Sequence, residues 1–515
     1  MTEISLLIAI PMIAGILTWL TPRFLGEENA GYFAFVASLV PLAISVYVWF
    51  VPFEQAGNAL TGGAIQLEEK VTWIEAMGYK IQYFVGMDGI SMPLVLLTTL
   101  LITVAIMSAW PAIDERRNQF YGLVLLLEGG LIGVFTSLDF LLFYVFWEMV
   151  LIPMYFLVAV WGGPKRKYAA MKFFVYTNIA SLLMFIGVMA LYFNAGVKNL
   201  SMVALTEAVH SGELAGAFGL SAHVFQIAAF VALFVGFAVK VPMVPFHTWL
   251  PDAHVQAPTP VSVILAGVLL KMGTYALLRF NFTILSEVAI QFSTLIAIAG
   301  AASVIYGALL AMAQTDLKRI VAYSSISSMG YVVIGLAAYT EFGVGGATFQ
   351  MISHGLISGL MFMVVGVVYH NTHTRSVHEM SGIVKKSPMV AGVFVVTAFG
   401  YMGLPGMSGF AGELFVFLGG MSSDVMAGSQ VVVPVAMFGI VLVAGYLLFA
   451  MQRTMFGTYD APERYKDEVG DASLSEAVPL FVLLIVIIAL GLQPDVVFDM
   501  IQQSSTAVVE LAGGV

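Results

Sequence analysis

The sequence of 515 residues contains no cysteine. It therefore forms no disulfide, and it offers no thiolate to an iron–sulfur cluster or a zinc ion. It also lacks a GxGxxG loop after a strand and a GxxxxGK(S/T) loop, which are the usual cradles for nucleotides. The eight histidines show no metal-binding spacing. We expect no cofactor in this chain, so any electrons involved in its function travel elsewhere.

Charged residues are scarce as well. They make up 10% of the chain, whereas about 25% is usual in soluble domains, and 60% of the residues are hydrophobic. This composition excludes an ordinary soluble enzyme. The net charge of -10 gives no reason to expect a nucleic-acid partner.

Long apolar runs take the place of the missing charges, and runs of 18 or more residues predict membrane-spanning helices. We count fourteen such runs, two of them broken. The first lacks the basic flank and cleavage site of a removable signal peptide. We therefore predict an all-α, polytopic protein surrounded by membrane lipids. The spans are expected at 3–22, 30–53, 87–110, 119–136, 140–161, 169–194, 224–248, 258–280, 284–311, 319–340, 344–369, 389–420, 430–452 and 474–493.

The 21 lysines and arginines are distributed unevenly. Fifteen of them, including Arg23, lie in loops after odd-numbered spans, and four lie in loops after even-numbered spans. Because positive residues mark the cytoplasmic side of a membrane protein, the odd loops are expected in the cytoplasm and both termini outside. The last two, Lys240 and Lys271, lie inside apolar segments.

Lys240 precedes a break in its span at Pro242 and Pro245. A charged group at the bilayer centre costs about 3 kcal/mol, so a lysine there indicates a functional site. Prolines leave backbone carbonyls unpaired, which membrane helices tolerate beside a cavity or another helix. A broken helix beside a lysine is typical of a transport site.

A second break, at Pro405 and Gly406, has Glu413 beside it. The two breaks fall in spans seven and twelve, which indicates a period of five spans. Since five is odd, the second repeat crosses the membrane in the opposite sense, the inverted plan of secondary transporters. The predicted units are 1–117 (spans one to three), 118–282 (first repeat), 283–455 (second repeat) and 456–515 (last span and tail).

Glu148 lies in a span without lysine or arginine, so its charge must be matched from another helix. Lys240 is the nearest candidate by depth, and we expect the two in contact. At about 4 Å and an effective dielectric near 20, their attraction is about 4 kcal/mol. Movement of the carboxylate would then release or reload a proton on the lysine. The alternative is a static buried ion pair.

Glu128 is expected at the same depth as Glu148, since the two lie at similar distances from the turn at 137–140. Two carboxylates at one depth can share or relay a proton, whereas the alternative for Glu128 is a hydrogen bond to a neighbouring helix. His354 lies at the middle of its span and can carry protons, the alternative being a core histidine with its hydrogen bonds satisfied.

His247 and His254, with Asp252 between them, lie at the cytoplasmic end of the first broken span. They suit either a proton entrance or helix caps, and the sequence leaves both open.

Six stretches together are typical of one family: FYVFWEMVLIPMYFLVAVWGG, YAAMKFFVYT, VKVPMVPFHTWLPDAHVQAPTPVSVILAGVLLKMGTYALLRF, DLKRIVAYSSISSMGYV, MISHGLISGL and LPGMSGFAGE. The chain resembles, over essentially its whole length, the antiporter-like membrane subunits of respiratory complex I, the proton-pumping NADH:quinone oxidoreductase. Within that family it is most similar to the bacterial M chains, the counterparts of mitochondrial subunit four.

The resemblance implies a proton path driven by quinone reduction in neighbouring subunits of a bacterial inner-membrane complex. NADH, FMN, iron–sulfur clusters and quinone are expected in other subunits, and the L- and N-type chains are expected partners. At the position of Glu413, glutamate is typical of the M type, whereas L-type, N-type and antiporter relatives carry lysine there. The path implied runs through Glu148, Lys240, Lys271, His354 and Glu413.

One departure concerns Ser328, which occupies a position where some relatives have histidine. A relay at that position would need a serine with ordered water. Two other functions remain open. A subunit of a multi-subunit sodium–proton antiporter would share the fold and both lysines, but Glu413 in place of lysine argues against it. A structural spacer would keep pumping intact when Lys240 is neutralised.

Overall fold

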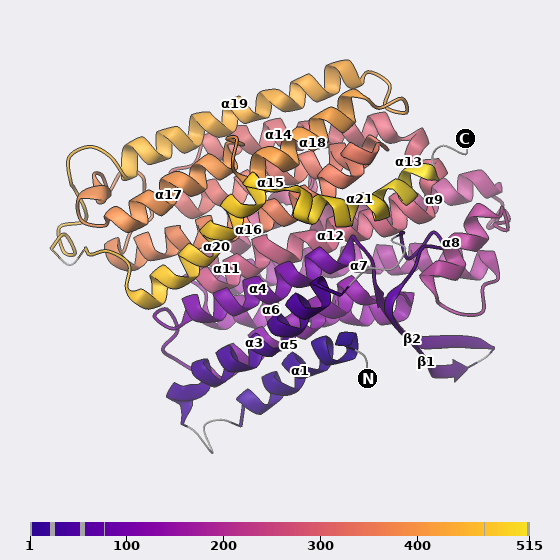
Figure 1. Ribbon diagram of the computed structural model, residues 1–515, viewed down its shortest axis with the longest axis horizontal. Coiled ribbons are helices and arrows are strands. Elements are labelled where there is room, and N and C mark those ends of the chain that lie inside the picture. The colour runs from indigo at the N-terminus through magenta and orange to yellow at the C-terminus, as the bar shows by residue number, and fades with distance from the viewer. Residues whose placement is uncertain (1–2, 21–25, 52–56, 77, 468, 512–515) are drawn as a thin grey trace.

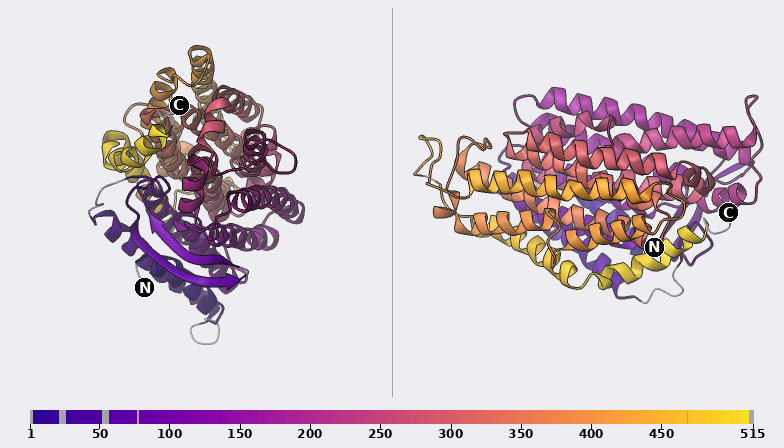
Figure 2. Two further views of the ribbon diagram at one scale, coloured as in Figure 1. Left: turned by 90° about the vertical axis from the view of Figure 1, so that its right-hand side faces the viewer. Right: turned by 90° about the horizontal axis from the view of Figure 1, so that it is seen from above.

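The computed structural model describes residues 3–20, 26–51, 57–76, 78–467 and 469–511. Its helices run side by side as one elongated bundle, and a β-hairpin lies across the ends of the N-terminal helices (Figures 1 and 2). The expected ends of the first two spans, at 22 and 53, and Arg23 lie outside the described residues.

The N-terminal part supplies three long helices and the hairpin. These are α1 (Glu3–Thr18), α3 (Ala30–Trp49), strands β1 (Gln66–Ala76) and β2 (Tyr79–Met87), and α4 (Ser91–Ala109), with a 3-10 turn η1 (Glu27–Asn29) before α3. The next helices are α5 (Arg117–Thr136), α6 (Phe140–Trp161), α7 (Arg166–Ala195), the short α8 (Met202–His210) and α9 (Ala222–Lys240).

Shorter pieces follow at the centre of the chain. They are η2 (Phe246–Thr248), α10 (Trp249–Gln256), α11 (Thr259–Ile264), the π-helix η3 (Leu265–Leu269), α12 (Leu270–Ala276), the π-helix η4 (Leu277–Ile284) and α13 (Ser286–Gln291). The remaining helices are α14 (Ser293–Met312), α15 (Leu317–Ala337), α16 (Glu341–Thr372), η5 (Ile383–Lys385), α17 (Pro388–Tyr401), α18 (Ser408–Met421), α19 (Ser429–Thr454), α20 (Leu474–Leu492) and α21 (Asp495–Glu510).

Twelve helices of the described chain are long and apolar enough to cross a membrane, and α1, α17 and α18 are shorter apolar helices. The prediction of a multi-pass, helical membrane protein is therefore confirmed. The count of fourteen spans adds α1 and treats α17 and α18 as one broken span, and it stays a prediction.

Both expected helix breaks are present. Helix α9 ends at Lys240, and helical structure resumes at Phe246, beyond Pro242 and Pro245. Helix α17 ends at Tyr401, and α18 begins at Ser408. Between the pieces, Gly403 and Gly406 have positive φ angles, a conformation that favours glycine.

Two regions differ from the sequence-based expectation. The segment between the second and third expected spans contains most of the hairpin, in which Val71 pairs with Tyr83 and Val85 forms a bridge to Ser137. The span expected at 258–280 is not a uniform α-helix, because η3 and η4 are π-helical turns on either side of α12. Such turns are frequently found at functional sites.

The loops form two groups, one at each end of the bundle. The hairpin, the turn at 137–139 and the segment at 199–201 are joined by β-bridges at one end. Residues 111–113, 161–164, 255–259 and 366–375 meet around one cavity at the other. This arrangement agrees with the alternation expected from the charge count, because the second group follows odd-numbered spans.

Candidate functional site

Lys271 and His354 form a hydrogen-bonded pair in the interior. The two nitrogen atoms, Lys271 Nζ and His354 Nδ1, are 2.7 Å apart, and Nζ also donates to the carbonyl oxygen of Ala266 at 2.6 Å. The exposed fractions of Lys271 and His354 are 0% and 2%. A charged lysine has only donors, so it bonds Nδ1 as an acceptor and leaves the imidazole proton on Nε2. His354 Nε2 makes no hydrogen bond within the described chain.

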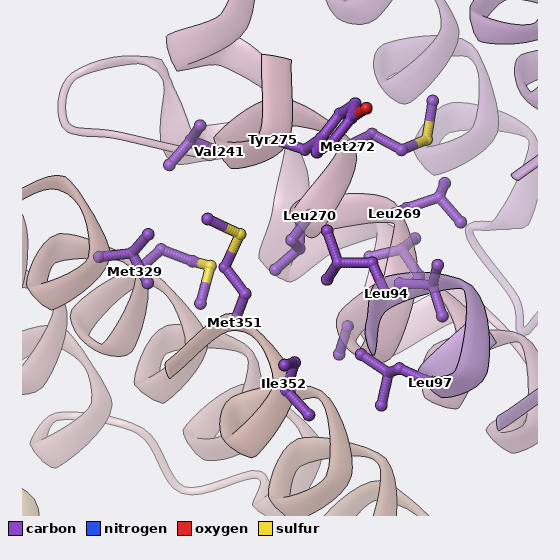
Figure 3. Packing of buried hydrophobic residues seen from close by; sticks show 14 of the residues in the cluster. Leu94, Leu97, Val241, Leu269, Leu270, Met272, Tyr275, Met329, Met351 and Ile352 are labelled. Carbon is purple, nitrogen blue, oxygen red and sulfur yellow. The ribbon is translucent and has the colours of Figure 1, made fainter. Parts of the chain in front are cut away.

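Hydrophobic side chains of three helices pack together in this part of the interior. They include Leu270 and Met272, the chain neighbours of Lys271 on α12, Met351 and Ile352 of α16, and Leu94 of α4 (Figure 3). A low-dielectric setting of this kind strengthens the interaction between the two nitrogen atoms. The structure thus brings together two of the residues that the sequence placed in one path.

Lys240 is the last residue of α9 and is 2% exposed. Its Nζ makes no hydrogen bond to the described residues and lies 5.0 Å from the ring centroid of Trp147 and 5.9 Å from that of Phe173. An ammonium group within about 6 Å of an aromatic face gains roughly 0.5–2 kcal/mol. The lysine is held mainly by aromatic faces.

Glu148 and Lys240 lie close enough for their charges to interact. The direct contact expected from the sequence is nevertheless not formed. The carboxylate of Glu148 accepts a hydrogen bond from Asn178 Nδ2 of α7 at 3.3 Å, while the lysine faces the indole of Trp147. The expected pair is therefore a separated one, and Asn178 is a partner that the sequence did not reveal.

Gly273 lets the helix that carries Lys271 pack closely against the first break. A Cβ atom on Gly273 would lie 2.8 Å from Val241 N and 3.0 Å from Lys240 Cβ. Only a residue without a side chain lets the end of α9 approach α12 this closely. Lys240 and Lys271 therefore sit on directly adjoining helices.

Glu413 lies on α18 and is 5% exposed. A Cβ atom on Gly403 would fall 2.5 Å from Glu413 Oε2, so the carboxylate lies against the backbone of the second break. This oxygen makes no hydrogen bond within the described chain. The break reaches the surface of the chain at Leu404 and Pro405, which are exposed.

Glu128 is fully buried in α5, and neither of its carboxylate oxygens makes a hydrogen bond within the described residues. The groups that act on Glu148 are Lys240 and polar side chains of α7, and Glu128 is not among them. The structure thus shows neither the proposed sharing with Glu148 nor a hydrogen bond to a neighbouring helix.

His247, Asp252 and His254 point to three different neighbours and form no common cluster. His254 is fully buried, and neither of its ring nitrogens makes a hydrogen bond within the described chain. Their neighbours are Tyr306 for His247 (ring centroids 5.6 Å apart), Lys172 for Asp252 (Nζ to Oδ2, 2.8 Å) and Phe362 for His254 (ring centroids 4.4 Å apart).

A cavity of about 390 Å³ opens between the loops that follow odd-numbered spans. Lys318 lies in its wall and donates from Nζ to the carbonyl oxygen of Ala257. His370 and Glu476, whose Nδ1 and Oε1 are 3.0 Å apart, also line it. Val255 and Gln256, the two residues that follow His254 in the chain, also line the cavity. From the sequence alone, Lys318 is one of the fifteen loop charges, because it lies at a span end.

Ser328 is 7% exposed on α15. It lies four residues after Ser324, so the two share one face of the helix.

The comparisons with known proteins agree with the expected resemblance. A family profile described as NADH:quinone oxidoreductase/Mrp antiporter, TM matches residues 137–461. NAD(P)H-quinone oxidoreductase chain 4 of Synechococcus elongatus is 40% identical over 502 residues, which cover 97% of this chain and 90% of that protein. F(420)H(2) dehydrogenase subunit M of Methanosarcina mazei is 38% identical over 516 residues, which cover 99% of this chain and 98% of that protein.

Among solved structures, the structure of respiratory complex I from Thermus thermophilus with bound NADH contains a chain of the same fold. The TM-score is 0.84 at 24% identity, with 99% of this chain and 100% of that chain covered. The family resemblance indicated by the sequence motifs is thus confirmed, and the chain belongs to the NADH:quinone oxidoreductase/Mrp antiporter family of transmembrane proteins.

Proposed function

We propose that this chain is a proton-translocating membrane subunit of an NADH:quinone oxidoreductase of the complex I type. Quinone reduction in neighbouring subunits drives protons along the path Glu148, Lys240, Lys271, His354 and Glu413. The observation that carries the proposal is the buried hydrogen bond between Lys271 and His354, since it joins α12 of the first proposed repeat to α16 of the second. Relatives at about 40% identity over nearly the whole chain bear corresponding names.

The geometry suggests how charge movement shifts a proton. In the part of the chain that the structure describes, Lys240 has no hydrogen-bond partner, so its protonation depends on the charge of Glu148 and on the faces of Trp147 and Phe173. A charge arriving from a neighbouring subunit that draws the carboxylate away lets Lys240 release its proton toward Lys271. Each proton moved against 100 mV costs about 2.3 kcal/mol.

From Lys271 the proton enters His354 at Nδ1 and leaves from Nε2 toward Glu413, which releases it to the outer side. We place access from the cytoplasm at the cavity lined by Lys318 and by Val255, the residue after His254. His247, Asp252 and His254 belong to the stretch of chain that precedes this lining, and we assign them to the entrance. Glu128 adds a buried carboxyl to the first repeat, on the α5 side of Glu148.

The architecture proposed has two inverted repeats, 118–282 and 283–455, between the N-terminal spans 1–117 and the final unit 456–515. The grouping of the loops at two ends supports it. We place the chain in a bacterial inner membrane with both termini on the outer side. L- and N-type chains are its neighbours in the membrane arm, and NADH, FMN, iron–sulfur clusters and quinone belong to other subunits.

The alternative, a component of a sodium–proton antiporter, is favoured by the family description alone, which names both types. Glu413 distinguishes them, because antiporter relatives are expected to carry lysine at this position. Proton uptake that is independent of sodium supports the oxidoreductase, whereas uptake that requires sodium supports the antiporter.

The test is NADH-driven proton uptake by inverted membrane vesicles carrying Lys240→Ala, with Lys167→Ala, an exposed lysine, as the matched control. Electron transfer from NADH to a soluble acceptor reports assembly. We expect quinone reduction and proton uptake to collapse in Lys240→Ala while the soluble-acceptor rate persists. Uptake per electron at the wild-type level in Lys240→Ala would instead establish the structural spacer.

A further inference from the structure

Two buried tyrosines lie in the part of the molecule between His354 and Glu413. Tyr401 ends α17 and Tyr446 lies on α19, and their exposed fractions are 6% and 2%. Neither hydroxyl makes a hydrogen bond within the described chain. An unsatisfied buried hydroxyl costs about 1–3 kcal/mol, so two of them in one region call for a functional reason.

Tyr401 lies at the edge of the second break and reaches His354. The two rings meet edge to face, with centroids 6.1 Å apart and planes at 85°. The hydroxyls of three serines act on the Tyr401 hydroxyl without forming a hydrogen bond to it: Ser324 and Ser325 of α15 and Ser358 of α16.

Tyr446 continues from this point toward Glu413. Its hydroxyl interacts with Ser324, which it shares with Tyr401, and the charge of Glu413 acts on it. The groups on the way from His354 to Glu413 are therefore hydroxyls contributed by four helices. His354 lies next to Tyr401, and the charge of Glu413 acts on Tyr446. His354 Nε2 and Glu413 Oε2 make no hydrogen bond within the described chain.

We propose that Tyr401 and Tyr446, with Ser324, Ser325 and Ser358, form a hydroxyl segment that conducts protons between His354 and Glu413. The inference rests on the proposed function and adds the groups that bridge its last gap. It also accounts for Ser328: Ser324, one turn earlier on the same face of α15, belongs to the segment, so the path needs no histidine on that helix.

The proton balance of the segment is simple. The Tyr401 oxygen accepts a proton that leaves His354 Nε2, and its own phenolic proton passes to the next oxygen. The last hydroxyl protonates Glu413 Oε2. One proton has then moved from a nitrogen to a carboxylate, every hydroxyl is neutral again, and each must rotate before the next transfer.

Tyr331 provides a matched control. It is also buried, and the charge of Glu413 acts on it as well. Its hydroxyl, however, already donates to the carbonyl oxygen of Ala436 at 3.4 Å and packs against Gly439. Removal of this hydroxyl takes away a structural hydrogen bond and leaves the segment intact.

The experiment compares Tyr401→Phe, the double variant Tyr401→Phe/Tyr446→Phe and Tyr331→Phe in the complete complex in inverted vesicles. Three quantities are measured: proton uptake per electron, its slowing in deuterium oxide, and electron transfer to a soluble acceptor. We expect uptake to fall about threefold in the single variant and at least about tenfold in the double variant. These losses are smaller than the roughly hundredfold or larger effect of a sole positioned proton carrier, because the serine hydroxyls remain. Tyr331→Phe should stay close to wild type.

A rescue variant separates conduction from structure. Adding Ser328→His to Tyr401→Phe supplies a second titratable ring on the serine face of α15, and we expect it to recover much of the lost uptake. A purely structural loss would not respond to this change. The deuterium effect should also grow in Tyr401→Phe, because proton transfer then limits the rate.

Two results would overturn the inference. The first is wild-type uptake in the double variant while Lys240→Ala abolishes uptake, which leaves the relay standing without its hydroxyl segment. The second is an equal loss in Tyr331→Phe and Tyr401→Phe, which assigns the effect to structure. Should Lys240→Ala itself pump normally, the proposed function fails, independently of either tyrosine.

Discussion

Each broken helix carries one ionisable residue near its break, and the two residues have opposite charges. The lysine ends the half-helix before the first break, and the glutamate lies near the start of the half-helix after the second break. Lys240 is the last residue of α9, and Glu413 lies in the second turn of α18 with its carboxylate against the break at Gly403. A helix C-terminus favours a cation and an N-terminus an anion, by about 0.3–1 kcal/mol at the surface and up to about 2 kcal/mol where partly buried. Each sign thus suits its own half-helix.

The two breaks also differ in what surrounds them. The first is enclosed by Trp147, Phe173 and the closely approaching backbone of Gly273. The second opens to the surface of the chain at Leu404, which is 37% exposed. We infer that the enclosed break stores a charge and that the open break exchanges a proton with groups outside the chain.

Replacement of Glu413 by glutamine, at the open break, should reduce proton uptake more than the two changes that follow. Glutamine keeps the shape but cannot take up a proton, so proton uptake should fall about a hundredfold or more, the range for loss of a positioned acid or base. Glu463→Gln, at an exposed position, is the comparison variant. Equal losses in both would show that the second break has no special place in the path.

Substitution of Gly403 by alanine tests the same break by moving the Glu413 carboxylate without removing it. The new Cβ would lie 2.5 Å from Glu413 Oε2 at a φ of +64°, so the carboxylate must shift. Gly428→Ala is the matched control, since its φ is +74° and nothing lies within 4 Å of the new Cβ. We expect proton uptake to drop roughly threefold to tenfold in Gly403→Ala only, because misplacement by about 1 Å can cost up to about a hundredfold.

Loss of the tryptophan ring over Lys240, at the enclosed break, should have the smallest effect on proton uptake of the three changes. In Trp147→Phe the ring over Lys240 becomes a weaker cation partner, and the hydrogen bond from Trp147 Nε1 to Ser181 Oγ is lost. A change of about 0.5–1 kcal/mol corresponds to a twofold to fivefold effect on proton uptake. Trp73→Phe, at an exposed site in β1, is the control for the same substitution away from Lys240. An unchanged rate in Trp147→Phe would remove the indole from the account.

Much of the plan was predictable from the sequence, because charge in an apolar chain is rare and its positions carry meaning. The breaks followed from Pro242, Pro245, Pro405 and Gly406, and the adjacency of Lys271 and His354 followed from the family resemblance and is present as a direct hydrogen bond.

Side-chain partners were harder to predict. In a bundle that is apolar on all sides, periodicity does not show which way each helix faces. The separation of Glu148 from Lys240, with Asn178 and Trp147 as their nearest partners, was therefore missed. The tyrosine pair was missed for the same reason, since Tyr401 and Tyr446 look like ordinary core residues along the chain.

The most direct test of the account is proton uptake per electron in vesicles carrying Lys271→Arg. Arginine keeps the positive charge and the donors for Ala266 and His354, but it does not release a proton in proteins. We predict that proton uptake and quinone reduction collapse while electron transfer to a soluble acceptor persists. Wild-type uptake per electron with arginine at this position would show that Lys271 serves only as a fixed charge and would contradict the relay.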